Sequence, residues 1–149
     1  MIADQLYFEE VEPGAAIAPL VKRPTNVQLF RYSAATWNAH RIHYDKEYAR
    51  VEGYDDILVQ SHLHGCFLVQ MVMDWAGPRA RLVRFSWQNR RMALPGDQLT
   101  CTGLVTGKYQ ADGICYVECR LEERNQRGET CAPGTAVIAL PSVTARDGK

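Results

Sequence analysis

The chain has 149 residues, with 17 basic and 17 acidic side chains, so its formal net charge at pH 7 is zero. This length suits one domain, residues 1–149, with a sizeable apolar core. The balanced charge argues against a nucleic acid or a membrane surface as partner. No apolar run is long enough to predict a membrane span.

The N-terminus and the five cysteines predict a cytoplasmic protein. The first ten residues are acidic and lack the basic and apolar regions of a signal peptide. An odd number of cysteines without an export signal favours free thiols. Cys115 and Cys119 lie four residues apart in a predicted strand, so they share a face with Val117 and Leu121. We therefore expect them in the core rather than as metal ligands.

The first predicted elements are a strand over residues 16–21 and a helix that begins at about Asn26. Thr25 and Gln28, three residues apart, match a capping box at the start of this helix. Three apolar residues then fall on one helical face: Val27, Phe30 and Ala34.

The next segment, residues 36–45, is the leading candidate for the active site. It reads Thr-Trp-Asn-Ala-His-Arg-Ile-His-Tyr-Asp and holds His40 and His43; the other two histidines of the chain are His62 and His64. Polar side chains gathered on a loop beside an apolar framework are a common way to build a site. Histidine can give and take protons near neutral pH. The competing interpretation is a solvated or hydrogen-bonded loop without catalytic function.

Two further helices are predicted after this loop. A short one covers residues 45–51 and is ended by Gly53. A long one begins at Ser61 and ends at Gly77-Pro78. The long helix is apolar on most of its surface, so it belongs in the interior. The apolar residues that recur at every fourth position are Leu63, Phe67, Met71 and Trp75.

From residue 79 onward the apolar residues alternate with polar ones, which predicts strands. Asp112-Gly113 is typical of a tight hairpin between two of them. Four strands in sequence, joined by short turns, predict an antiparallel meander. The fold class is therefore α+β, with an antiparallel sheet wrapped around the buried helix. The sheet keeps an exposed edge, which a second subunit would cover.

With these motifs, the chain resembles the hotdog fold and the MaoC-like (R)-specific hydratases and dehydratases, from about residue 24 to residue 141. That group carries an Asp-x-Asn-Pro-x-His loop after a helix. The whole loop is similar to the branch of type 2 hydroxyacyl-thioester dehydratases and mesaconyl-C4-CoA hydratases. The positions that match the loop are Asn38, His40, Arg41 and His43. Three other stretches carry the resemblance. The family's His-Gly-x-Leu motif at the entry to the long helix is matched by Ser61, His62, Leu63 and His64. Two strand-turn motifs of the family are matched by Leu94-Pro95-Gly96-Asp97-x-Leu99 and Asn125-Gln126-x-Gly128.

The resemblance implies reversible addition of water to a 2-enoyl thioester of CoA or acyl carrier protein, with no cofactor and no metal. His43 would be the main acid/base, while His40 and Asn38 hold the water and fix the tautomer of His43. Backbone N–H groups near His64 and Gly65 would polarise the thioester carbonyl, because helix N-termini favour negative charge. Ser61 and His62 would lie beside the thioester, and the candidates for the CoA phosphates are Arg41, Arg84, Arg90 and Arg91. A homodimer, a higher homo-oligomer or a hetero-oligomer with another hotdog subunit is implied.

The chain departs from that family at its catalytic acid, which is Asn38 here. An asparagine can position a water but cannot accept its proton. Three explanations remain open: His43 works with His40, Asp45 supplies the carboxylate, or the subunit is catalytically poor.

Three other functions remain open as well. A thioesterase on the same fold would release free thiol. A non-catalytic hotdog subunit would need an active partner, and Asn38 favours this alternative. The pair His40-x-x-His43 together with His62-x-His64 would be a four-histidine metal site.

Overall fold

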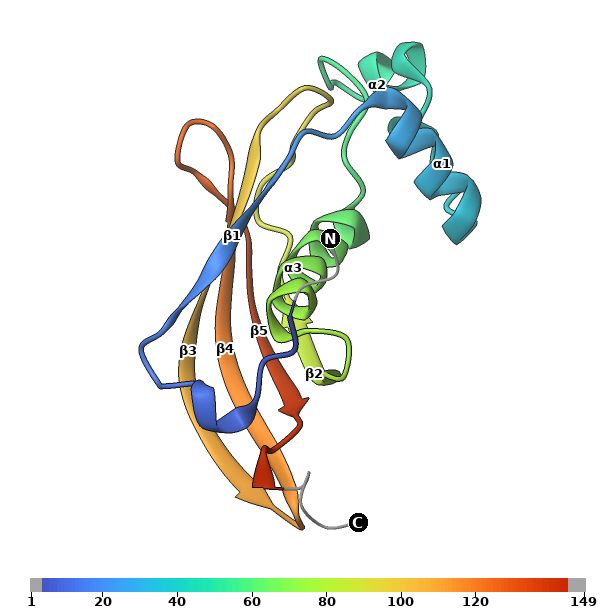
Figure 1. The fold of residues 1–149 in the computed structure, drawn as a ribbon. Coiled ribbons are helices and arrows are strands. Elements are labelled where there is room, and N and C mark those ends of the chain that lie inside the picture. Colours follow the sequence, from blue (N-terminus) through green and yellow to red (C-terminus); the bar gives the residue numbers. More distant parts are fainter. Residues whose placement is uncertain (1–3, 145–149) are drawn as a thin grey trace.

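The computed structural model describes residues 4–144 and shows one antiparallel sheet curved around a long helix (Figure 1). The strand order across the sheet is β1-β3-β4-β5-β2. The predicted sheet around a central helix is confirmed. The strands are β1 (Ala16–Lys22), β2 (Arg81–Trp87), β3 (Leu99–Ala111), β4 (Ile114–Arg124) and β5 (Thr130–Leu140).

The predicted meander is correct for three strands and wrong for β2. β3, β4 and β5 are consecutive neighbours. Asp112 and Gly113 form the hairpin turn between β3 and β4, with φ of 51° and 76°. β2, however, pairs with β5 at the far edge of the sheet. The connection from β2 to β3, residues 88–98, is too long for a hairpin turn and lets the chain cross to the other side of the sheet.

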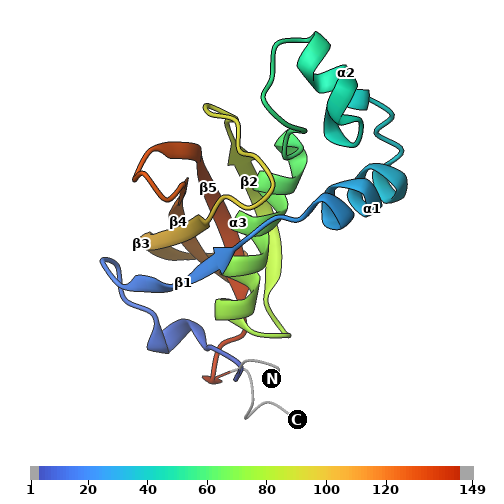
Figure 2. The same cartoon turned by 90° about the horizontal axis from the view of Figure 1, so that it is seen from above.

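Helix α3 (Ser61–Ala76) lies along the concave side of the sheet (Figure 2). Leu68 and Val72 have no exposed surface and belong to the same core cluster as Val117 and Ile138 of the sheet. The predicted burial of Cys115 and Cys119 is confirmed, as is the end of the helix at Gly77, whose φ is 89°. All five cysteines are free thiols.

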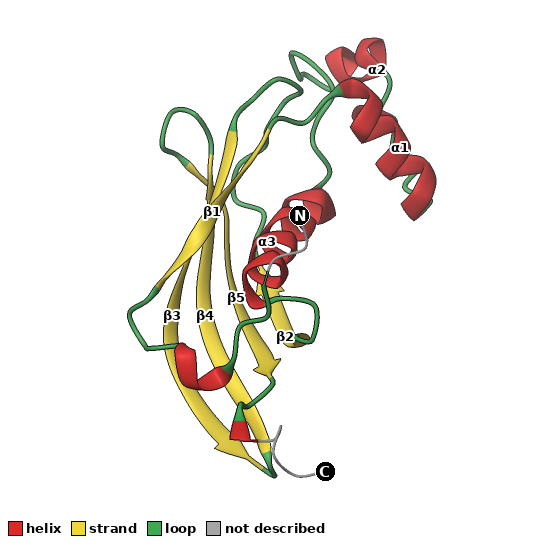
Figure 3. Ribbon diagram, viewed as in Figure 1, coloured by secondary structure: helices red, strands yellow, loops and turns green. Residues whose placement is uncertain are grey.

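Helices α1 (Asn26–Thr36) and α2 (Lys46–Val51) lie beyond one end of the sheet, near the start of α3 (Figures 1 and 3). The predicted N-cap is confirmed, because Thr25 Oγ1 accepts a hydrogen bond from the backbone N–H of Gln28 at 3.2 Å. The predicted apolar face of α1 is not the buried one. Val27 and Phe30 are 66% and 60% exposed, whereas Leu29 and Ser33 are buried.

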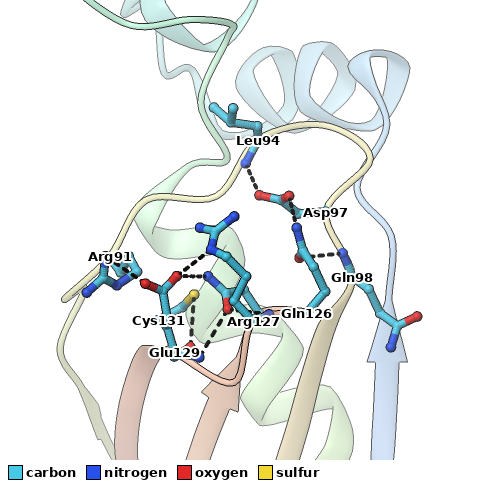
Figure 4. Close-up of polar contacts among 9 residues, drawn as sticks. Arg91, Leu94, Asp97, Gln98, Gln126, Arg127, Glu129 and Cys131 are labelled. Atoms are coloured by element: carbon cyan, nitrogen blue, oxygen red, sulfur yellow. Dashed lines mark hydrogen bonds and ion pairs between the residues drawn. The ribbon is translucent and has the colours of Figure 1, made fainter.

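Two turns that carry the family resemblance are interlocked at this end of the sheet (Figure 4). Asp97 accepts a hydrogen bond from the backbone N–H of Leu94 at 2.9 Å and another from the side chain of Gln126 at 2.6 Å. The Gln126 side chain in turn accepts a hydrogen bond from the N–H of Gln98 at 3.2 Å. These contacts join the two turns through polar side chains. Within residues 4–144, no helix is long and apolar enough to cross a lipid bilayer.

Candidate active site

The loop between α1 and α2 is built around Asn38. Trp37 ends α1 in the left-handed conformation, at φ 57°. The N–H of Asn38 then donates to the carbonyl of Ser33 at 2.9 Å. The side-chain oxygen of Asn38 accepts from the N–H of His40 at 3.3 Å. Asn38 therefore shapes the loop that carries both histidines.

His43 is buried in a single 3-10 turn, Arg41–His43, and its ring is fixed by the backbone. Nδ1 of His43 lies 2.8 Å from the carbonyl oxygen of Leu58, and the N–H of Leu58 donates to the carbonyl of Ile42 at 2.9 Å. A carbonyl can only accept, so Nδ1 carries the hydrogen and Nε2 of the neutral ring is an acceptor. The sequence-based prediction assigned this orientation to His40 and Asn38, but Leu58 provides it.

The environment of His43 favours its neutral form. Burial lowers the pKa of His43, the Leu58 carbonyl opposes this effect, and the nearby His40 adds to it. The two rings meet edge to face, with their centroids 5.9 Å apart. His40 is exposed, and its Nε2 lies 3.8 Å from a carboxylate oxygen of Glu52. The structure thus brings the two predicted histidines together and keeps the inner one ready to accept a proton.

Asp45 and Arg41 are committed to local structure. One oxygen of Asp45 caps α2 by accepting from the N–H of Tyr48 at 3.0 Å, and the other accepts from the guanidinium of Arg41 at 2.5 Å. The N–H of Tyr48 and the Arg41 guanidinium hold the pKa of Asp45 below its usual value. A carboxylate held in this way is a poor proton acceptor at neutral pH, which weighs against Asp45 as the replacement acid.

The start of α3 offers two free backbone donors, at Ser61 and His62. The N–H groups of Leu63 and His64 donate to the carbonyl of Gln60, and that of Gly65 lies inside the helix. Among the described residues, no acceptor is found for the N–H groups of Ser61 and His62. The free backbone donors at the start of α3 are therefore Ser61 and His62, three residues before the predicted His64 and Gly65.

The side chains at the start of α3 differ in their surroundings. A Cβ added at Gly65 would lie 3.0 Å from the ring of Trp87, so a larger residue there would require the ring to shift by a few tenths of an ångström. The exposed His62 meets the same ring edge to face, with centroids 5.5 Å apart. His64 is fully buried against Glu123 of β4. The side chain of His64 is thus directed into the core rather than toward the loop.

Two fully buried polar residues, Gln60 and Glu123, were not predicted. Gln60 is fully buried, and its amide donates to the carbonyl of Leu29 at 2.7 Å and to Ser33 Oγ at 2.9 Å, so it ties the start of α3 to α1. The sequence feature that could have predicted the burial of Gln60 is its position directly after the apolar run 57–59. Glu123 occupies an inward position of β4, in line with Leu121, where the alternating pattern predicts an apolar residue.

The predicted arginines have different partners. Arg91 pairs with Glu129 at 3.3 Å (Figure 4). Arg84 and Arg90 are exposed and form no ion pair within the described part of the chain. Arg90 lines a hollow of about 740 Å³, together with Arg120, Arg124 and several apolar residues. Of the four candidates for phosphate contacts, only Arg84 and Arg90 have no carboxylate partner within residues 4–144.

The four histidines do not converge on one point. Across residues 4–144, no three His, Cys, Asp or Glu side chains are grouped so that they could hold a metal ion. This arrangement counts against a four-histidine site. A separate hollow of about 220 Å³ lies beside Asn38 and is lined mainly by apolar side chains, those of Phe30, Ala34, Trp37, Ala39 and Tyr44.

Solved structures with this architecture include R-hydratases. The unliganded R-hydratase PhaJ1 of Pseudomonas aeruginosa superposes with a TM-score of 0.87 at 20% identity, over 95% of this chain and 90% of that one. The (R)-hydratase of A. caviae involved in PHA biosynthesis has a TM-score of 0.81 at 19% identity, over 89% and 99% of the two chains. The expected hotdog fold is confirmed.

Two curated proteins are similar in sequence. The mitochondrial type 2 hydroxyacyl-thioester dehydratase of Saccharomyces cerevisiae is 33% identical over 55% of this chain and 31% of its own length. The mesaconyl-C(4)-CoA hydratase of Chloroflexus aurantiacus is 50% identical over 32% of this chain and 16% of its own length. The matches thus span a third or less of these relatives. Residues 11–95 match the model of the type 2 hydroxyacyl-thioester dehydratases, and the chain belongs to that family.

Proposed function

We propose that this chain catalyses the reversible hydration of a 2-enoyl thioester, with His43 as the acid/base. The observation that carries the proposal is the fixed and buried imidazole of His43, whose Nδ1 is held by Leu58 and whose Nε2 is left for proton transfer. Its lowered pKa keeps that nitrogen unprotonated at neutral pH, as a general base requires.

In the hydration direction, Nε2 of His43 takes a proton from a water held by His40 and Asn38. The water oxygen adds to the β carbon, and the double bond shifts so that negative charge develops on the thioester oxygen. The free N–H groups of Ser61 and His62 stabilise that charge at the start of α3. The proton then passes from His43 to the α carbon, so that atoms and charge balance without a cofactor.

The substrate would be a thioester of CoA or acyl carrier protein. The apolar hollow beside Asn38 offers room for part of the acyl group. Arg84 and Arg90, which have no carboxylate partner in the described part of the chain, are the best candidates for phosphate contacts. The five free thiols fit the reducing, cytoplasmic location that the sequence predicts.

The test is hydration of crotonyl-CoA, followed by loss of the enoyl-thioester absorbance. The variant His43→Ala should lower the rate by about 10²-fold or more, the scale of lost acid/base catalysis. Its thermal melting should show that it remains folded. A folded variant with wild-type activity would remove His43 from the mechanism. Release of free thiol would identify the chain as a thioesterase instead.

A second candidate function is a non-catalytic subunit, and Asn38 in the position of the family's acid favours it. Two solved structures with the same fold are the ChsH1–ChsH2 complex and the HadBC complex, both from Mycobacterium tuberculosis. If this chain were such a subunit, the purified protein would be inactive and would recover activity only with a second hotdog chain.

We also propose that the chain works as a dimer or higher oligomer. β1 and β2 are the edge strands of the sheet, and each has one side without a partner strand in the described chain. A second copy that pairs along an edge would extend the sheet. Light scattering at micromolar concentration should give at least twice the mass of the chain, and a monomer mass would contradict this proposal.

A further inference from the structure

His64 and Glu123 form a completely buried polar pair that the proposed reaction does not use. Both side chains are 0% exposed, and Nδ1 of His64 is hydrogen-bonded to Oε1 of Glu123. The other carboxylate oxygen lies 3.9 Å from the thiol of Cys101, whose pKa is raised by burial and by the nearby carboxylate. The pair connects the first turn of α3 to the last residues of β4.

The contact with Glu123 is the hydrogen bond that holds the His64 ring. Nε2, the other ring nitrogen, is buried and has no hydrogen-bond partner among the described residues. A single hydrogen bond between Nδ1 of His64 and Oε1 of Glu123 therefore fixes the direction of this side chain.

Stability alone does not explain this pair. Replacing a buried ion pair by apolar residues of similar volume is often neutral or stabilising. Leu121 and Cys101, which share the inward face of the sheet with Glu123, show that this part of the core accepts apolar side chains. Apolar packing is non-directional, whereas a charge-assisted hydrogen bond fixes both distance and direction.

The location of the pair suggests what it directs. Ser61 and His62, whose N–H groups are free, precede His64 by three and two residues in the same turn. Leu58, which holds the ring of His43, is three residues before Ser61. The hydrogen bond at His64 therefore holds the segment that carries both the Ser61 and His62 donors and the Leu58 carbonyl that orients His43.

We infer that Glu123 is a positioning residue: through His64 it sets the orientation of the first turn of α3, and with it the Ser61 and His62 donors. This inference depends on the proposed function. It differs from that function because His64 and Glu123 are fully buried and act through the helix rather than on the substrate. Donors displaced from the developing oxyanion stabilise the transition state less, even when the fold is intact.

The test is the double variant His64→Leu with Glu123→Leu, together with the single variant Glu123→Gln. The double variant should fold and melt near the wild-type temperature. Its kcat should fall by about tenfold or more with KM changed less than about twofold, because the donors act on charge that develops in the transition state. Glu123→Gln, which keeps the size but not the charge, should show a smaller loss of kcat.

The matched control is Glu122→Gln. Glu122 is the neighbouring carboxylate on β4, but it is on the opposite face, where it accepts a hydrogen bond from Thr130 and pairs with Arg124. Its loss should leave kcat unchanged. A folded double variant with wild-type kcat would overturn the inference. So would failure of both His64/Glu123 variants to fold, because the pair would then serve the core itself.

A readout without activity separates this inference from the proposed function. In an amide NMR spectrum, the resonances of Ser61 and His62 should shift in Glu123→Gln and remain in place in Glu122→Gln. Unmoved amides would overturn the positioning role whether or not the protein is active. An inactive wild type whose Ser61 and His62 amides do shift would contradict the proposed function only.

Discussion

The carbonyl oxygen of Leu58 lies 2.8 Å from Nδ1 of His43, and this contact determines which ring nitrogen can react. Leu58 is held in turn by the hydrogen bond from its N–H to the carbonyl of Ile42. The hydrogen bond that orients the ring therefore comes from the backbone, and two hydrogen bonds join the loop to the segment before α3. A backbone acceptor cannot lose its function by protonation near neutral pH, unlike a carboxylate.

The pH dependence of the rate should reflect the burial of His43. Its pKa is lowered from the ordinary histidine value of about 6.5, first by burial. The base form thus persists below pH 6.5, and kcat/KM should be flat from about pH 8 down to 6.5 and fall only below that. A pH–rate profile on one enoyl-CoA measures this. An acidic midpoint above about 6.5 would contradict the assignment.

The same shift makes a prediction for stability. Because the folded protein binds the His43 proton more weakly than the unfolded chain does, this group lowers the free energy of unfolding as pH falls below about 6.5. Above that pH it contributes no dependence. Urea unfolding of wild type and His43→Gln at a series of pH values should show that part of the acid sensitivity is lost in the variant. Equal pH dependence in both proteins would show that His43 is not the group responsible.

Gln60 should contribute to stability through its buried amide. The variant Gln60→Met keeps the length of the side chain but removes the hydrogen bonds to Leu29 and Ser33. We expect a loss of about 0.5–1.5 kcal/mol in the free energy of unfolding, the net value of a typical hydrogen bond, because the variant removes the donated bonds together with a side-chain oxygen that has no partner among the described residues. The control is Gln70→Met on the exposed side of the same helix, with an expected change within about 0.5 kcal/mol. Equal effects would show that the Gln60 contacts do not matter.

Much of the fold was predictable because periodic patterns determine it. The apolar repeat from Leu63 to Trp75 predicted α3, and the Asp112-Gly113 turn predicted the hairpin between β3 and β4. The position of β2 was not predictable from local signals. Its partner β5 is more than forty residues away in the chain, and no turn residue encodes a pairing at that distance. Only the strand order of the resembled fold could have supplied it.

The candidate site was predictable in its residues but not in its contacts. The cluster of His40 and His43 was visible in the sequence, because few segments concentrate so many polar groups. The ring orientation was assigned to side chains, whereas a main-chain carbonyl provides it, and every residue has one. Glu123 was overlooked although a charged residue at an inward strand position is unusual.

Trp37 occupies a strained position that glycine would relieve. Its φ of 57° is in the left-handed region. Its side chain is 91% exposed, so it makes few stabilising contacts that could offset the backbone strain. We expect Trp37→Gly to be more stable than Trp37→Ala by about 1 kcal/mol, since both lose the ring but only glycine relaxes the backbone. Thermal unfolding of the two variants measures the difference. Equal stability would mean that the backbone at this position carries no strain.

The departure at Asn38 can be tested by restoring the family's acid with Asn38→Asp. The loop should keep its shape, because an aspartate oxygen can accept the N–H of His40 as the asparagine oxygen does. The added negative charge favours imidazolium and raises the pKa of the nearby histidines. The base is then protonated at neutral pH, so the hydration rate at pH 7 should fall and recover as pH rises.

The alternative account of Asn38 predicts the opposite result. If the chain were a family member that has lost activity together with its catalytic acidic residue, Asn38→Asp would create or increase activity at pH 7. Asn89→Asp, which adds the same charge on the exposed loop after β2, controls for the change in net charge. We expect the loss of rate at pH 7, because the wild-type loop already places two imidazoles side by side and fixes one of them. The pH–rate profiles of the three proteins on one enoyl-CoA decide between the accounts, and a gain at pH 7 specific to Asn38→Asp would overturn His40 and His43 as the working pair.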